Sequence, residues 1–252
     1  MGRAARSQGP PEAPPIGAVL LLAAAGVLLA AGPYTASIEQ WRREREARLK
    51  ADGGWLTVSG LFWLKEGANT FGSDPAGDIV LPQGSAPPRA GVFEHRQGRT
   101  ILRWAAKPGP PLEMEPDSTI VPFGDLSFQV IQRGSRYGIR LRDNNSRFRR
   151  EFTGLRWYPV DPAWRVSARF IPYPQPRPLR VPSTIGEPQD YESPGYLEFE
   201  LQGKRLRLVP ASSANQLFII FKDLTSGKTT YPACRFLYAD LPQDGHVVLD
   251  FN

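Results

Sequence analysis

From Trp55 to the C-terminus, glycine, proline and aspartate divide the chain into short apolar segments, and no stretch in this part strongly favours a helix. Such segments are typical of β-strands joined by turns. The chain contains 26 prolines and 24 glycines, and with 41% hydrophobic residues this composition favours many strands and turns over disorder. We therefore predict a mainly β fold, an antiparallel barrel or sandwich.

The C-terminal segment Gln216–Asn252 predicts a β-hairpin followed by one further strand. Leu217–Phe221 is a short apolar run, and Thr229–Tyr238 is rich in residues that form strands. The residues between them have turn composition, and Gly227 suits a positive φ. Physical chemistry alone indicates no reaction here.

Several motifs, taken together, resemble a bacterial domain family of unknown function, DUF1684. The similarity runs from about Ser37 to the end of the chain. The motifs that carry it are Gly53-Gly54-Trp55-Leu56, Gly60-Leu61-Phe62-Trp63-Leu64, Gly67-Ala68-Asn69, Phe152-Thr153-Gly154-Leu155, Phe221-Lys222-Asp223 with Thr225-Ser226-Gly227, Thr230-Tyr231, Arg235-Phe236-Leu237 and Leu249-Asp250-Phe251-Asn252.

The resemblance implies an exported protein, since members of this family look exported. Family members usually continue past the Asp-Phe-Asn motif into a further tail, so we expect a C-terminally truncated member, because this sequence stops at Asn252. This chain also has Pro232-Ala233-Cys234 where the family tends to carry small residues and glycine.

The N-terminal run Ile16–Ala31 consists of apolar and small residues only. Its length suits the apolar region of a signal peptide and falls just short of the ~17–25 residues that span a bilayer. Because cleavage sites nearby are poor, we favour an uncleaved inner-membrane anchor over a removed signal. We expect the protein in the cell envelope, either anchored in the inner membrane or periplasmic. The basic residues after the run argue against this orientation, because basic residues beside a membrane segment usually stay on the cytoplasmic side.

Ser37–Ala51 predicts a short amphipathic helix, with Ser37 as its N-cap and Gln40 completing a capping box. Glu44 and Arg48, like Glu46 and Lys50, stand four residues apart in the favourable order. The helix either docks one edge on the β domain or lies on a membrane surface.

We predict four regions: residues 1–36 as tail and signal anchor, 37–53 as the helix, 54–125 as a small β module and 126–252 as an antiparallel β domain. Within the third region, Gly67–Pro82 resembles the start of a forkhead-associated domain, which is a phosphothreonine-binding sandwich. The Ser-x-x-His motif of that family is missing after it. This resemblance therefore concerns architecture at most.

The net charge of +6 is concentrated in one segment. Arg133–Arg169 contains ten arginines and three acidic residues, which gives a net charge of +7. In its first part Tyr137, Ile139 and Leu141 alternate with Arg140 and Arg142, so a strand there places the two arginines on one face. A guanidinium suits carboxylate or phosphate binding.

Three functions follow as hypotheses. The first is binding of a small anionic ligand or an envelope component through an arginine-lined β surface; the second is a hydrolase built on carboxylates; the third is a structural or interaction role. The candidate site residues are Arg140, Arg142, Asp143, Asp223, Thr225, Tyr231, Arg235 and Asp250. In the alternative without a ligand, the arginines pair with these carboxylates and stabilise the β structure. We expect Arg140 to lie beside Asp143, Asp223 or Asp250, and an unpaired arginine of the segment to face a concave site.

Other chemistries have little support in the sequence. Two histidines and one cysteine, far apart, do not match a zinc site, and we expect no metal, cofactor or nucleic acid. His95 is expected as an exposed strand residue, and Cys234 as a buried residue on a strand. No phosphate-binding loop or nucleophile motif is present.

Overall fold

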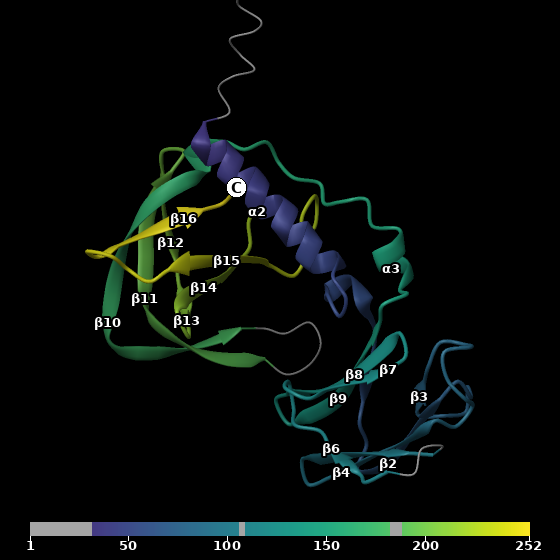
Figure 1. Cartoon of the computed structure of the whole chain (residues 1–252). Coiled ribbons are helices and arrows are strands. Elements are labelled where there is room, and N and C mark those ends of the chain that lie inside the picture. The colour runs from purple at the N-terminus through teal and green to yellow at the C-terminus, as the bar shows by residue number, and fades with distance from the viewer. Residues whose placement is uncertain (1–31, 106–108, 182–187) are drawn as a thin grey trace, which may run out of the picture.

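The computed structural model describes residues 32–105, 109–181 and 188–252. Figure 1 shows one long helix, α2, beside two groups of strands that follow each other along the chain. The fold is mainly β, as predicted, and its sheets are sandwich-like and do not close into a barrel. The expected anchor Ile16–Ala31 lies outside the described residues. Among the helices that are described, none is long and apolar enough to cross a membrane.

The first group of strands is a sandwich of two sheets, with strand orders β1-β9-β8-β7 and β3-β2-β4-β5-β6. A 3-10 turn, η1 (Trp55–Thr57), leads into it. Its strands are β1 (Val58–Trp63), β2 (Gly67–Gly72), β3 (Ile79–Val80), β4 (Gly91–Arg96), β5 (Arg99–Trp104), β6 (Leu112–Glu113), β7 (Ile120–Phe123), β8 (Leu126–Arg133) and β9 (Arg136–Asp143).

Aromatic rings from both sheets fill the core of this sandwich. Phe71, Phe93 and Phe128 are each at most 2% exposed, and their ring centroids lie 4.7–5.4 Å apart. His95 is buried as well, with Nδ1 2.9 Å from Thr100 Oγ1, so the prediction of an exposed histidine was wrong. The reason is the alternation of β4, which turns Gly91, Phe93 and His95 to the covered side.

The predicted boundary between residues 125 and 126 falls inside this sandwich. Strands β8 and β9 pair with each other and, at their outer edges, with β7 and β1. Phe128 and Ile139 belong to the same core as Phe93. The first unit therefore ends at about Asp143, because its sheet needs β8 and β9 as central strands.

The second group of strands follows residues 144–164, which contain the short helix α3 (Arg147–Arg150) and the 3-10 turn η2 (Pro162–Trp164). Its two antiparallel sheets have the orders β12-β11-β10-β16 and β13-β14-β15. The strands are β10 (Arg165–Val181), β11 (Gln189–Leu201), β12 (Lys204–Leu208), β13 (Pro210–Ser213), β14 (Gln216–Phe221), β15 (Arg235–Asp240) and β16 (His246–Asp250). Apolar residues of both sheets form a second core, which includes Leu197, Ile219 and Leu249.

The predicted C-terminal hairpin is present as β14 and β15, but its connection is longer than expected. The second strand begins at Arg235 instead of Thr229, because the intervening residues form a folded turn. Gly227 in that turn has φ +81°, as its sequence context indicates. Cys234 is half-buried and lies just before β15 instead of on a strand. The last strand, β16, pairs with β10.

Helix α2 (Pro33–Lys50) begins four residues earlier than predicted, with Gly32 as its N-cap. Pro33 occupies the first turn, where its missing N–H costs nothing. Ser37 is therefore inside the helix, where its hydroxyl donates to the carbonyl of Tyr34. Of the two expected ion pairs, Arg48 and Glu44 form one at 3.8 Å, whereas Glu46 turns to a different partner.

That partner is the strap, residues 150–164, which lies along the helix. Glu46 Oε1 accepts hydrogen bonds from Leu155 N at 2.9 Å and from Trp157 Nε1 at 2.7 Å. Arg42, only 6% exposed, donates from Nη2 to the carbonyl of Tyr158 and lies over the Trp157 ring. The helix is thus fastened to a segment more than a hundred residues away in sequence.

Candidate functional site

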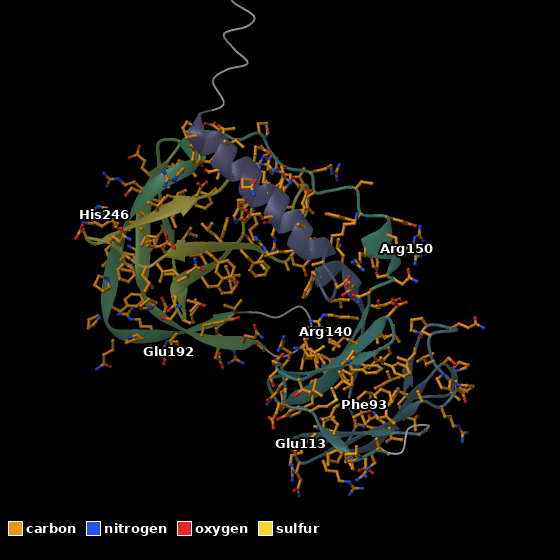
Figure 2. All side chains as sticks on the ribbon, in the orientation of Figure 1. Phe93, Glu113, Arg140, Arg150, Glu192 and His246 are labelled. Atoms are coloured by element: carbon orange, nitrogen blue, oxygen red, sulfur yellow. The ribbon has the colours of Figure 1, made fainter. Side chains whose placement is uncertain are left out.

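The candidate site lies on the outer face of the sheet β1-β9-β8-β7. As the alternation predicts, Ile139 and Leu141 of β9 point into the core, and Arg140 and Arg142 point to the other side. Figure 2 places Arg140 on the side of the sandwich that faces the rest of the molecule, with Phe93 deeper between the sheets. The two-residue alternation within β9 thus places two positive charges on one face.

Arg142 is half-buried and incompletely paired. Its Nη1 donates to Gln129 Oε1 at 2.9 Å, and Gln129 Nε2 in turn donates to the carbonyl of Asp117. Its Nε is buried and has no hydrogen-bond partner in the described part of the chain. Burial lowers the pKa of Arg142 below its ordinary value. No carboxylate of the described residues forms an ion pair with it.

Arg140 is more isolated than Arg142. Burial, followed by the positive charges of Arg142 and Arg133, lowers the pKa of Arg140, and the charge of Asp117 opposes this only in part. Its guanidinium lies 5.8 Å from the centre of the Trp55 ring. Over residues 32–105, 109–181 and 188–252 it forms no ion pair and no hydrogen bond through its side chain. Two partly desolvated cations without a carboxylate are poorly compensated, and a bound anion would offset that cost.

The expectation that Arg140 lies beside Asp143, Asp223 or Asp250 was wrong. Asp143 is near in sequence, but its Oδ1 accepts a hydrogen bond from the backbone N–H of Asn145 at 2.7 Å and closes the turn after β9. The other two carboxylates belong to the second unit. The sequence could not show this, because it does not tell which strands share a sheet.

Other arginines of the basic segment do have acidic partners, and most of these come from outside the segment. Five of the ten arginines form ion pairs in the described structure: Arg133 with Asp117, Arg147 with Glu151, Arg149 with Asp52, Arg165 with Asp250 and Arg169 with Glu198. The concentration of charge in sequence is therefore partly neutralised in space. Among the arginines without an ion pair in the described structure, Arg140 and Arg142 are the two whose pKa is lowered by burial.

Asp223, Thr225 and Arg235 lie together in the turn between β14 and β15. Asp223 accepts hydrogen bonds from the hydroxyl and backbone N–H of Thr225 and, at 2.7 Å, from Arg235 Nη1. Burial acts to raise the pKa of Asp223, but the hydrogen bonds from Thr225 and Arg235 outweigh it and the pKa is lowered. Tyr231 is exposed and joins none of these contacts. This arrangement locks a turn and has no free acid or base.

Asp250 fastens helix α2 to the end of the chain. Its two carboxylate oxygens accept hydrogen bonds from Tyr34 OH at 2.8 and 2.9 Å, and Asn252 Nδ2 donates to both Asp250 and Tyr34. Arg165 Nε lies 3.6 Å from the same carboxylate. Burial, followed by the hydrogen bond and the charge of Asp250, raises the pKa of Tyr34 to about 12. Asp250 is therefore a structural group.

Two open hollows lie elsewhere and contain none of the eight predicted site residues. One, of 450 Å³, is lined by Gly134, Arg180, Pro188, Gln189, Asp190 and Tyr191. The other, of 570 Å³, lies over β10, β11 and β12, where Arg169 and Arg207 both bind Glu198. No group of three histidine, cysteine or acidic side chains in the described residues could hold a metal ion.

Fold and site together define an all-β protein with a helix fastened to its C-terminal unit and a basic face on its N-terminal sandwich. Residues 150–252 match the model of a family described as protein of unknown function (DUF1684), which supports this domain family for the strap and the second unit. Arg140 and Arg142 lie outside the matched residues.

A solved structure also shows similarity. It is the solution NMR structure of an uncharacterized protein from Haloarcula marismortui, with 27% sequence identity and a TM-score of 0.35. The match covers 41% of this chain and 60% of that chain, so it spans less than two thirds of the solved protein. No curated protein matches this chain.

Proposed function

We propose that this protein is a binding module of the cell envelope that holds a small anionic ligand at Arg140 and Arg142. The observation that carries the proposal is the state of Arg140, a partly buried guanidinium beside a second one, without a carboxylate partner among the described residues. A carboxylate or phosphate placed between the two would receive charge-assisted hydrogen bonds and neutralise the repulsion. Arg142 itself forms no ion pair in the described residues, and its Nε is buried without a hydrogen-bond partner, so its charge is also incompletely compensated.

Anion-dependent thermal melting tests this proposal. We expect inorganic phosphate to raise the melting temperature of the parent protein at low ionic strength, and to leave that of Arg140→Gln unchanged. Arg147→Gln is the matched control, since Arg147 comes from the same basic segment but is exposed and paired with Glu151. If phosphate raises the melting temperature of all three proteins equally, the effect comes from general charge screening, and the proposed site is refuted.

The carboxylate hydrolase is the less favoured alternative. A hydrolase of this kind needs acid and base groups in reach of one substrate. Asp143, Asp223 and Asp250 instead take part in three separate networks, and the pKa of Asp223 is lowered, not raised. The geometry therefore supports binding over catalysis.

An interaction role has one observation in its favour. Phe218, Phe236 and Tyr238 form a stacked ladder across β14 and β15, with Tyr191 packed edge-on against Phe218. Phe236 and Tyr238 are each 58% exposed. Exposed aromatic groups of this size are typical of surfaces that meet a partner. Loss of a partner on substitution of Tyr238 by serine, with phosphate binding intact, would identify this second role.

The location in the envelope rests on the sequence of Ile16–Ala31 and on the family resemblance. We propose an uncleaved inner-membrane anchor there. The full-length protein should fractionate with membranes, and a variant that starts at Ser37 should not. Mature protein free in the periplasm, with a new N-terminus after Gly32 or beyond, would show a cleaved signal instead.

A further inference from the structure

The surroundings of Arg140 indicate what else its ligand carries. Residues that face each other directly in neighbouring strands share one face of a sheet. On the outer face of this sheet Arg140 therefore stands in a row with Leu61 of β1, Gln129 of β8 and Ile120 of β7. The positive charge has a polar neighbour on one side and an apolar neighbour on the other.

The apolar side continues beyond Leu61. The next row on the same face contains Trp63, Gly138 and Ile131. Trp63 packs so closely on Gly138 that a Cβ there would lie 3.0 Å from Trp63 Cε3, and Ile131 is fully buried although it belongs to neither core. Because Ile131 is buried and the Arg136 guanidinium lies 3.8 Å from the centre of the Trp63 ring, the apolar surface of this face beside Arg140 is that of Leu61.

Trp55 lies beside Arg140 and is 65% exposed. It follows Gly54, whose missing side chain allows the backbone to lie against the end of helix α2; a Cβ on Gly54 would be 2.6 Å from the carbonyl oxygen of Arg48. The backbone position from which the Trp55 side chain starts is therefore fixed by tight packing. Its ring centre is 5.8 Å from the Arg140 guanidinium, so one ligand can contact both.

We infer that the ligand is a free anionic amphiphile, a carboxylate carried by a medium-length alkyl chain, with its head at Arg140 and Arg142 and its chain against Trp55 and Leu61. This inference rests on the proposed function and adds the apolar half of the ligand. Inorganic phosphate would compensate the two guanidinium groups but would leave Trp55 and Leu61 in water. An alkyl chain beside the carboxylate covers them, and each buried methylene lowers the Kd about fourfold.

Calorimetric titration with acetate, butanoate, hexanoate and octanoate tests the inference on the full chain. We expect the Kd of the parent to fall at least about tenfold from acetate to octanoate. Trp55→Ala should bind acetate and phosphate as the parent does but lose most of this dependence on chain length. Ile120→Ala is the matched control: Ile120 is 55% exposed, against 65% for Trp55, and lies at the end of the row opposite Leu61, so its variant should keep the dependence.

Each other outcome decides against the inference in a distinguishable way. Phosphate binding without any gain from acetate to octanoate overturns the amphiphile and leaves the anion site standing. No binding of any anion refutes both. Octanoate that binds Arg140→Gln as tightly as the parent, or neutral octanol that binds equally well, shows apolar contact without the charge. Binding to vesicles of anionic lipid but not to dissolved octanoate points to a membrane surface and also overturns it.

Discussion

Charged side chains on the outer face of β9 and in the C-terminal unit differ in whether they have partners of opposite or complementary character. Both carboxylates of the C-terminal unit accept several hydrogen bonds. Asp223 accepts them from the Thr225 hydroxyl and the Arg235 guanidinium, and Asp250 accepts them from the Tyr34 hydroxyl and the Asn252 amide. Burial lowers the pKa of both Arg140 and Arg142, yet neither guanidinium forms an ion pair in the described residues. Satisfied networks hold a fold together, whereas an uncompensated pair is where an added anion gains most.

The two regions also differ in their similarity to a known protein family. The family match covers the strap and the second unit, where the paired carboxylates lie. In that part Phe152 to Leu155 and Leu249 to Asn252 serve to hold helix α2, through Glu46 and Tyr34 respectively. These two motifs of the matched region therefore have a structural role, and the binding proposal rests on the sandwich that precedes that region.

The largest effect is expected from Asp250→Ala. The substitution removes the acceptor of Tyr34 and the neighbour of Arg165, and loss of a hydrogen bond to a charged group costs about 1.5–3 kcal/mol. Chemical denaturation measures this change in the free energy of unfolding. Asp190→Ala is the control, because the exposed pair of Asp190 with Arg180 at 3.9 Å should contribute less than about 1 kcal/mol. Equal effects of the two variants would remove the distinction between structural and solvated carboxylates.

A somewhat smaller loss is expected from Gly227→Val in the turn that contains Asp223. A Cβ at Gly227 has room, with Pro232 Cβ 3.9 Å away, so the cost comes from φ +81°. A β-branched residue in this conformation should lower the free energy of unfolding by about 1–2 kcal/mol. Gly227→Asn should cost clearly less, since asparagine tolerates a positive φ. An unchanged melting temperature in the valine variant would contradict the turn geometry.

A pH-dependent loss should separate the two regions at alkaline pH. Because the folded-state pKa of Tyr34 is raised from 10.0 to about 12, the protein binds this proton more tightly than the unfolded chain does. The resulting stability is fully present below pH 10 and is lost as the pH rises toward 12. The difference in unfolding free energy between the parent and Tyr34→Phe should therefore shrink over this window. A constant difference would place Tyr34 outside the Asp250 network.

Sequence patterns predicted what depends on near neighbours. The alternation of Tyr137 to Arg142 placed the two arginines on one face, and Gly227 marked its turn. They failed where distant segments compete for a residue. Glu46 has Lys50 four positions away but binds the strap, since a carboxylate gains more from two N–H donors than from an exposed ion pair.

Pairing of strands was the second limit of the sequence. The turn-rich composition predicted strands but could not tell that β8 and β9 complete the first sheet, because many sheet orders bury the same apolar residues. The proximity of Trp55 to Arg140 follows from that order and was equally hidden. In the sequence Trp55 stands out only as part of a family motif, although tryptophan and arginine side chains that lie together are typical of binding surfaces.

The smallest expected change in the free energy of unfolding comes from replacing Arg140 by leucine. It is the most informative change, because the same replacement of Arg235 in the C-terminal unit should have the opposite effect. Arg140→Leu removes a partly buried charge that has no carboxylate partner, and leucine fits beside Leu61 on the same face. In the absence of ligand we expect the free energy of unfolding to stay within about 1 kcal/mol of the parent or to rise. Arg235→Leu should instead destabilise the protein by at least about 1 kcal/mol, because it leaves Asp223 without its guanidinium partner. Urea denaturation of both variants and the parent, with and without phosphate, measures the four differences.

If Arg140→Leu destabilises the ligand-free protein as much as Arg235→Leu does, then Arg140 is a structural residue, and the uncompensated charge on β9 no longer distinguishes the sandwich from the C-terminal unit.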